Sequence, residues 1–227
     1  MITQPSNGIV AQGVSKRFGV KGSELTILKD IEMTAGLGEG VSVLGRSGSG
    51  KTTLLSLLGA LERPSRGEIN ILGTEISKAS DSSMEYLRRA DIGFVFQSFN
   101  LLPLLTVGEN VDLPLRMLGL SRAERLNRVQ ESLDQVGLGR YMYRLPEEIS
   151  GGEQQRVAVA RALAKKSKVV LADEPTGHLD SLTAEAIFNA LQSAAHDRGS
   201  LVIIATHDTS VADKSDRVLR IQDGVLG

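Results

Sequence analysis

Short apolar runs alternate along the chain with stretches that have the period of an amphipathic helix. Strand-like runs cover residues 9–14, 41–44, 69–72, 92–96, 169–172, 201–205 and 217–221, the last of which is expected at a sheet edge. Helical patterns cover residues 50–61, 123–136 and about 182–196, and a further helix starts at Ser150. This alternation predicts an α/β fold in which a mostly parallel sheet, with an antiparallel β edge, is covered on both faces.

The middle of the chain has a different, helical character. Pro103, Gly108 and Pro114 punctuate its first part, and a helix follows Ser121, which stands at capping-box spacing from Glu124. No linker long enough to separate independent domains interrupts the sequence. We therefore expect one domain over residues 1–227, with an α/β core at residues 1–96 and 166–227 and a helical subdomain at residues 97–165.

Composition narrows the class. The 227 residues are 41% hydrophobic and 23% charged, and 26 Lys and Arg against 27 Asp and Glu leave a formal net charge of −1. That balance argues against a nucleic-acid partner. The absence of Cys excludes disulfides, thiolate metal sites and a cysteine nucleophile. No run of about 18 apolar residues occurs, so we expect no direct membrane span, and the start of the chain does not have the pattern of a secretory signal.

A glycine-rich loop lies between the apolar run at residues 41–44 and the next helix. It fits the phosphate-loop pattern, in which glycines let successive backbone N–H groups face phosphate oxygens and the helix N-terminus adds positive potential. Lys51 is expected to reach the β- and γ-phosphates, and the Thr52 hydroxyl to bind Mg²⁺. The nucleotide-binding residues expected here are Gly45, Arg46, Ser47, Gly48, Ser49, Gly50, Lys51, Thr52 and Thr53.

Two adjacent carboxylates, Asp173 and Glu174, end the apolar run at residues 169–172. Neighbouring residues of a strand point to opposite sides. We therefore expect Asp173 to face Mg²⁺ through its water shell and Glu174 to polarise the water that attacks the γ-phosphate. Taken alone, two acids could equally cap a strand.

A second helix start also has the character of an anion site. Ser150 and Glu153 have capping-box spacing, and Gly151 and Gly152 leave the first turn without side-chain bulk. An ordinary capped helix explains this element equally well when it is considered alone.

Read in order, these motifs together with Gln97 and His207 resemble the nucleotide-binding subunit of an ABC transporter, over nearly the whole chain. Residues 149–156 correspond to the signature segment of that family. The resemblance implies a P-loop NTPase core that uses ATP and Mg²⁺ and hydrolyses ATP. It implies a catalytic set of Glu174, His207, Gln97 and Lys51, and metal ligation by Thr52, Gln97 and Asp173.

Other roles follow from the same resemblance. Phe18 falls where the family stacks an aromatic ring on adenine, and Asp180 corresponds to the aspartate that crosses the dimer seam. His178 departs from the Asn or Ala common before Leu179, with an undefined effect on the seam. Two copies are then expected to enclose two ATP, each between Lys51 of one copy and Ser150, Gly151, Gly152 and Glu153 of the other.

The sequence around Gln97 looks like the branch that powers macrolide export, lipoprotein release and haem export. That branch implies an integral membrane permease as partner and a peripheral location at the cytoplasmic face of the inner or plasma membrane. Apolar residues after Gln97, with Glu147 and Glu148, either frame the groove for the permease or simply pack the helical subdomain; they are Phe99, Leu101, Leu102 and Leu104. The alternative function is a non-transporting mechanotransmission ATPase of the cell-division type. A soluble ABC ATPase acting on nucleic acid is disfavoured by the short spacing between Thr52 and Ile149.

Overall fold

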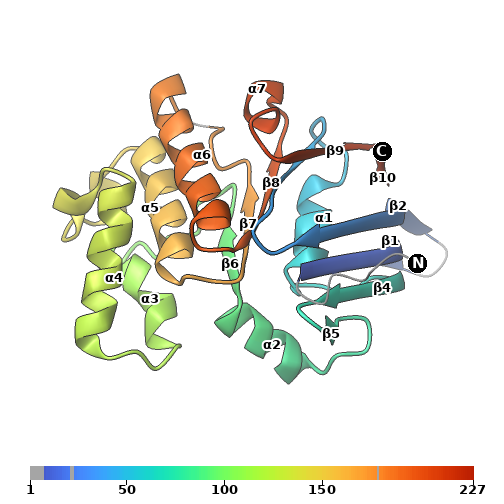
Figure 1. Ribbon diagram of the computed structural model, residues 1–227, viewed down its shortest axis with the longest axis horizontal. Coiled ribbons are helices and arrows are strands. Elements are labelled where there is room, and N and C mark those ends of the chain that lie inside the picture. Colours follow the sequence, from blue (N-terminus) through green and yellow to red (C-terminus); the bar gives the residue numbers. More distant parts are fainter. Residues whose placement is uncertain (1–7, 21–22, 178) are drawn as a thin grey trace.

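The computed structural model describes residues 8–20, 23–177 and 179–227, so the prediction for His178 lies outside the described residues. Figure 1 shows a helical half beside a half built from β-sheet. The central sheet has the order β10-β9-β3-β8-β7-β6. Its strands are β3 (Gly40–Leu44), β6 (Ile92–Val95), β7 (Val169–Asp173), β8 (Leu201–Thr206), β9 (Arg217–Gln222) and β10 (Val225–Leu226). All neighbours pair in parallel except β9 and β10, which confirms the mostly parallel sheet.

A second, antiparallel sheet has the order β2-β1-β4-β5. Its strands are β1 (Gly8–Val20), β2 (Ser23–Gly36), β4 (Arg66–Ile71) and β5 (Thr74–Glu75). The long β1–β2 pair starts at Gly8 opposite Gly36 and runs to Val20 opposite Ser23. This sheet confirms the expected antiparallel component.

Helices cover both faces of the central sheet (Figure 1). They are α1 (Lys51–Leu58), α2 (Asp81–Ala90), α3 (Val107–Arg116), α4 (Arg122–Gln135), α5 (Gly151–Ala164), α6 (Ser181–His196) and α7 (Thr209–Ala212), with 3-10 turns η1 (Gly139–Tyr141) and η2 (Pro146–Glu148). The buried strands divide their side chains between two cores by alternation. One core joins α1 to the antiparallel sheet and takes Val169, Leu171, Leu201 and Ile203. The other joins α3, α4, α5 and α6 and takes Val170, Ala172, Val202 and Ile204.

Three local predictions were wrong. β9 is not an edge strand, because it lies between β3 and β10. Gly108 and Pro114 do not precede a helix as punctuating residues but lie inside one, α3. This helix starts with a complete capping box between Thr106 and Glu109. Ser121 does cap α4, but Glu124 pairs with Arg128 instead of returning to the cap.

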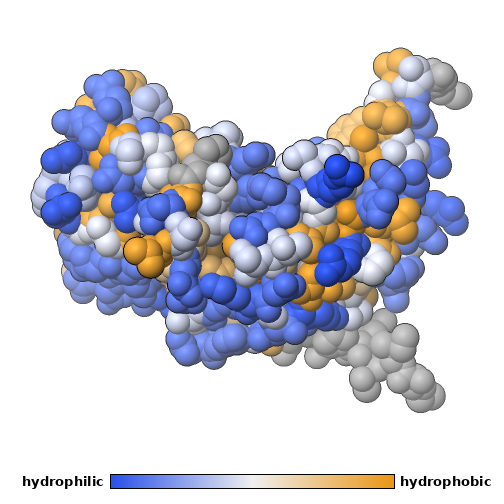
Figure 2. Space-filling model, turned by 90° about the horizontal axis from the view of Figure 1, so that it is seen from above, coloured by the Kyte–Doolittle hydropathy of each residue, from blue (hydrophilic) through white to orange (hydrophobic). Residues whose placement is uncertain are grey.

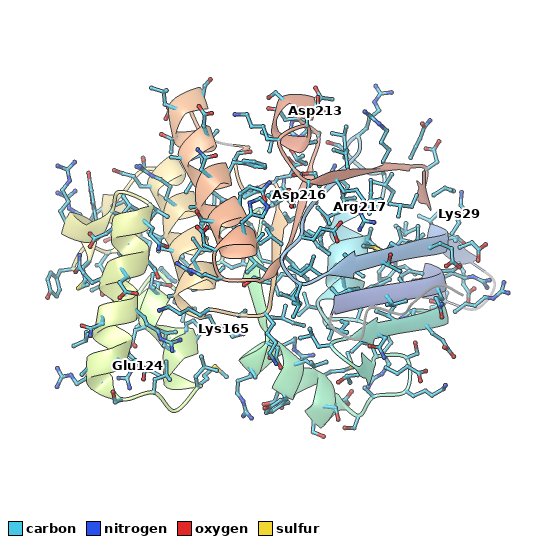
Figure 3. The ribbon with its side chains drawn as sticks, in the orientation of Figure 1. Lys29, Glu124, Lys165, Asp213, Asp216 and Arg217 are labelled. Atoms are coloured by element: carbon cyan, nitrogen blue, oxygen red, sulfur yellow. The ribbon has the colours of Figure 1, made fainter. Side chains whose placement is uncertain are left out.

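Lys165 closes the C-terminal end of α5. Its ammonium donates to the backbone carbonyls of Arg88, at the end of α2, and Ile92, at the start of β6. Figure 3 shows Lys165 near the lower end of α5, where the helical half meets the sheet. Burial lowers the pKa of Lys165 to about 8, although the nearby Asp91 opposes the shift.

The lowered pKa of Lys165 gives a pH-dependent contribution to stability. Between pH 8 and about 10.5 the unfolded chain holds a proton that the folded chain releases, so stability rises with pH in this window. We expect the unfolding free energy of the wild type, relative to Lys165→Met, to rise by at most about 3 kcal/mol across it. Urea unfolding of both proteins at several pH values measures this. A pH-independent difference would show that the Lys165 pKa is not lowered.

Candidate active site

The phosphate loop connects β3 to α1 by a close backbone approach. A Cβ at Gly45 would lie 2.6 Å from the carbonyl oxygen of Ile221, so only glycine fits there. Gly48 and Gly50 have φ of +79° and +107°, a conformation that glycine adopts without strain. The loop, His207 and residues 220–223 line one open hollow. Residues 220–223 had no recognisable signal in the sequence, because only the β9–β10 hairpin brings them to the loop.

Lys51, Glu174 and His207 form one connected cluster, and His207 also lines this hollow. The Lys51 Nζ lies 3.4 Å from Glu174 Oε1 and donates to the carbonyl oxygens of Gly45 at 2.7 Å and Arg46 at 3.2 Å. The other carboxylate oxygen of Glu174 lies 2.9 Å from His207 Nδ1. Lys51 and Glu174 are 7% and 9% exposed, so their ion pair is shielded from solvent. The cluster therefore joins the start of α1 to the ends of β7 and β8.

The direction of Glu174 has a different cause from the one that alternation suggests. β7 ends at Asp173, and Glu174 has a φ of +48°, in the left-handed region. A non-glycine residue adopts this conformation at a cost, and such residues gather at functional sites. The turn, rather than the strand pleat, aims Glu174 at Lys51 while Asp173 faces α1.

Asp173 and Thr52 form a second pair beside the cluster. The Thr52 hydroxyl donates to Asp173 Oδ2 at 2.6 Å. Asp173 Oδ1 is buried and has no hydrogen-bond partner among the described residues. Burial raises the pKa of Asp173, while the Thr52 hydrogen bond opposes the shift. The Thr52 hydroxyl and the Asp173 carboxylate, one of whose oxygens has no partner, are oxygen ligands of the kind that Mg²⁺ binds.

Gln97 lies on the turn that follows β6 and is exposed. Within the described chain, no hydrogen bond connects it to Thr52 or Asp173. Beyond it, Phe99 and Leu101 pack on the second core, whereas Leu102 and Leu104 are 46% and 90% exposed. Packing of the helical half therefore accounts for Phe99 and Leu101. Leu102 and Leu104 face solvent, where a permease groove was the other interpretation.

The helix start at Ser150 is a complete capping box. Glu153 N–H donates to Ser150 Oγ at 3.3 Å, and Ser150 N–H donates to Glu153 Oε2 at 2.8 Å. This backbone hydrogen bond is the main cause of the lowered pKa of Glu153. Gly151 is exposed, and Gly152 is partly exposed. Within the described residues of one chain, no hydrogen bond or ion pair connects residues 150–153 with Lys51.

Phe18 and Asp180 are also separate from the cluster. Phe18, on β1, is 42% exposed and lines a pocket with Arg66. The centroid of its ring lies 4.9 Å from Lys16 Nζ. Asp180 is exposed at the N-cap of α6, where it accepts hydrogen bonds from the Thr183 N–H at 3.0 Å and the Thr183 hydroxyl at 2.6 Å. These bonds lower the pKa of Asp180.

Figure 2 shows an outline that is concave between the helical half and the opposite end, which carries apolar side chains.

Comparison with known proteins identifies the family. The family model described as ABC transporter matches residues 28–177. The chain belongs to the ABC transporter family. It is an ABC ATPase, and no helix in its described residues is long and apolar enough to cross a membrane.

Individual relatives cover almost the full chain. The chain is 40% identical to the uncharacterized ABC transporter ATP-binding protein YknY of Bacillus subtilis, with 95% of this chain and 94% of that protein covered. It is 38% identical to the lipoprotein-releasing system ATP-binding protein LolD of Shewanella denitrificans, with 96% and 94% covered. The ATP-binding/permease protein MacB of Wolinella succinogenes is 41% identical over 96% of this chain, which corresponds to 34% of MacB.

A solved structure confirms the fold of this ABC ATPase. It is described as the dimeric structure of a post-hydrolysis state of the ATP-binding cassette MJ0796 bound to ADP and Pi. The TM-score is 0.91 at 40% identity, with 96% of each chain covered. The expected α/β cassette is therefore the observed one.

Proposed function

We propose that two copies of this chain enclose two ATP molecules and hydrolyse them to drive a membrane permease that exports or extrudes its substrate. The observation that carries this proposal is the position of Glu174 between Lys51 and His207, beside a phosphate loop. The likeness to a dimeric cassette bound to ADP and Pi supports it. So does the likeness to relatives whose names include lipoprotein release and macrolide export.

ATP would bind with its phosphates in the loop. The positive φ of Gly48 and Gly50 lets the loop turn its backbone N–H groups toward the anion, and the α1 N-terminus favours the negative charge. Lys51 is already held by two loop carbonyls, so its ammonium needs little reorganisation to meet the β- and γ-phosphates. The remaining loop residues expected to contact nucleotide are Arg46, Ser47, Ser49, Thr52 and Thr53, and Phe18 would stack on the adenine ring.

Thr52 and Asp173 would hold Mg²⁺, with Gln97 as a further ligand. The buried, unpartnered Asp173 Oδ1 supports this assignment. When bound, the ion neutralises phosphate charge during the transfer.

Hydrolysis would depend on Glu174 and His207. Glu174 accepts a proton from the attacking water while the water oxygen forms a bond to the γ-phosphorus. The bond between the γ-phosphorus and the bridging oxygen of the β-phosphate breaks, which gives ADP and phosphate. His207 hydrogen-bonds Glu174 and is exposed to the hollow, where it can also contact the γ-phosphate. The ion pair with Lys51 keeps Glu174 at the site while nucleotide is absent.

The second copy would complete each site. Ser150, Gly151, Gly152 and Glu153 form a capped helix start separate from Lys51 in one chain, which supports a role across the seam. Asp180 would cross the same seam. We divide the domain accordingly, with an α/β core at residues 1–96 and 166–227 and a helical subdomain at residues 97–165.

The permease would place this ATPase at the cytoplasmic face of the inner or plasma membrane. The exposed Leu102 and Leu104, on the loop after Gln97, support a docking surface there. The permease determines the transported substrate.

A charge introduced at Gly151 tests the composite site. A Cβ at Gly151 would touch only the Phe99 ring, at 3.9 Å, and a carboxylate in the first turn favours a helix. We therefore expect Gly151→Asp to fold and bind ATP normally as a monomer. Across the seam, its carboxylate would repel phosphate and weaken the ATP-dependent dimer by more than about a hundredfold.

Light scattering of the Glu174→Gln protein with ATP, with and without Gly151→Asp, measures this effect. Ala123→Asp is the matched control, because it adds the same charge to the exposed first turn of α4. An ATP-bound dimer that survives Gly151→Asp would leave residues 150–153 as an ordinary helix cap.

A further inference from the structure

The loop that follows Gln97, residues 97–106, is attached to the helical half by side chains of α3 and α5. Its strand, β6, ends at Val95. Asn110 of α3 binds the far end of the loop: its Oδ1 accepts from Leu102 N–H at 2.7 Å, and its Nδ2 donates to the carbonyls of Leu102 and Leu105 at 3.1 Å and 3.0 Å. Asn110 is 1% exposed, so these hydrogen bonds are protected from water.

Arg161 of α5 binds the near end of the same loop. Its guanidinium donates to the carbonyl oxygen of Phe99 at 2.7 Å and to that of Asn100 at 2.6 Å. Arg161 is partly buried, and this burial lowers the pKa of its guanidinium. Hydrogen bonds from a charged donor are stronger in such surroundings.

The two carbonyls that Arg161 holds belong to a costly turn. Phe99 and Asn100 have φ of +60° and +51°, so two consecutive non-glycine residues are left-handed. Such residues persist only where the surrounding structure imposes the conformation. The fork of one guanidinium spans both carbonyls and supplies that constraint two residues after Gln97.

The C-terminal end of α5 is fixed to the core. Lys165, one turn beyond Arg161, binds the carbonyls of Arg88 and Ile92. A Cβ at Gly93 of β6 would lie 3.2 Å from the Ala162 carbonyl oxygen, so strand and helix meet closely there. The N-terminal end of α5 carries Gly151, which lies beside the Phe99 ring. The loop thus contacts both the N-terminal and the C-terminal half of α5, while Lys165 anchors the C-terminal end of α5 to the core.

We propose that Arg161 is a positioning residue that fastens the Gln97 loop to α5, so that Gln97 and the signature segment move as one unit. The joint is then confined to residues 96–98, between the end of β6 and the first carbonyl that Arg161 holds, and the Phe99 N–H closes this turn by donating to the Phe96 carbonyl oxygen at 3.2 Å. Engagement of Gln97 at one nucleotide sets the position of the α5 N-terminus that faces the other nucleotide. This inference rests on the proposed roles of Gln97 and Ser150.

A double-mutant cycle on ATP turnover tests it. We expect Arg161→Met to lower kcat about tenfold and to change the nucleotide Kd by less than about twofold, because Arg161 does not touch the phosphate loop. Arg161→Lys keeps the charge but cannot bridge both carbonyls, so it should lower kcat about threefold. In a Gln97→Ala background, neither substitution should lower kcat further. Arg198→Met is the control, since Arg198 donates to Leu163 of the same helix and not to the loop.

Hydrogen exchange provides a readout independent of activity. In Arg161→Lys, amides of residues 99–106 should exchange at least about tenfold faster, while those of α1 keep the wild-type rate. Unchanged exchange in the loop would overturn the proposal. Multiplicative losses of kcat in the double mutant would also overturn it and leave the proposed function intact. A Gln97→Ala protein with normal kcat would remove both this inference and the proposed role of Gln97.

Discussion

Replacing Glu174 by glutamine should lower ATP turnover by about a hundredfold or more while ATP binding is retained. The amide preserves the size of the side chain but cannot accept the proton of the attacking water. Binding should survive because Lys51 keeps its hydrogen bonds to the carbonyls of Gly45 and Arg46. Removing the negative charge also frees the Lys51 ammonium from a competitor of the phosphates.

The measurement is steady-state phosphate release together with calorimetric titration of ATP into the same protein. Glu185→Gln is the matched control, because Glu185 makes an exposed ion pair with Lys214, away from the hollow. Phosphate release near the wild-type rate in Glu174→Gln would exclude Glu174 as the base. Turnover lost together with ATP affinity would instead indicate that Glu174 organises Lys51.

The order of elements in the α/β core could be predicted from the sequence because each buried strand is a continuous apolar run. The phosphate loop could be predicted because its glycines are required by local geometry: Gly45 meets the Ile221 backbone, and Gly48 and Gly50 have positive φ. Asp173 likewise ends its strand, and Glu174 directly follows it. These signals are local, so a sequence pattern contains them.

Other features depend on distant contacts and could not be predicted. β2 and α2 were not anticipated. The alternation of buried and exposed residues in β2 is regular only over residues 31–35 and is interrupted at Lys29 and Asp30, which are both exposed, and α2 buries only Met84 and Leu87. α3 was interpreted as punctuated chain, because Pro114 lies in the helix despite its unfavourable propensity. Its stability comes instead from the capping box at Thr106 and from packing in the second core. Arg161 had no local signal at all, since the carbonyls that it binds lie 61 and 62 residues earlier in the chain.

Lys51→Ala should weaken the binding of Mg²⁺-ATP by at least about a hundredfold. A hydrogen bond to a charged group contributes about 1.5–3 kcal/mol, and every 1.4 kcal/mol changes Kd about tenfold. The substitution also leaves Glu174, which is 9% exposed, without its cation beside the incoming phosphates, and this repulsion adds to the loss. The fold should persist, because α1 is held by the apolar side chains of Leu54, Leu55, Leu57 and Leu58.

Titration calorimetry with Mg²⁺-ATP measures the affinity, and circular dichroism verifies the fold. Lys214→Ala removes a lysine from an exposed ion pair and serves as the control. A second variant, Lys51→Ala with Glu174→Gln, separates the two causes, since it lacks both the cation and the repelling carboxylate. Partial recovery of affinity in that variant would measure the repulsion by Glu174, and the remaining deficit would measure the direct contribution of Lys51. An unchanged affinity in Lys51→Ala would remove the assignment of residues 45–52 as the phosphate loop.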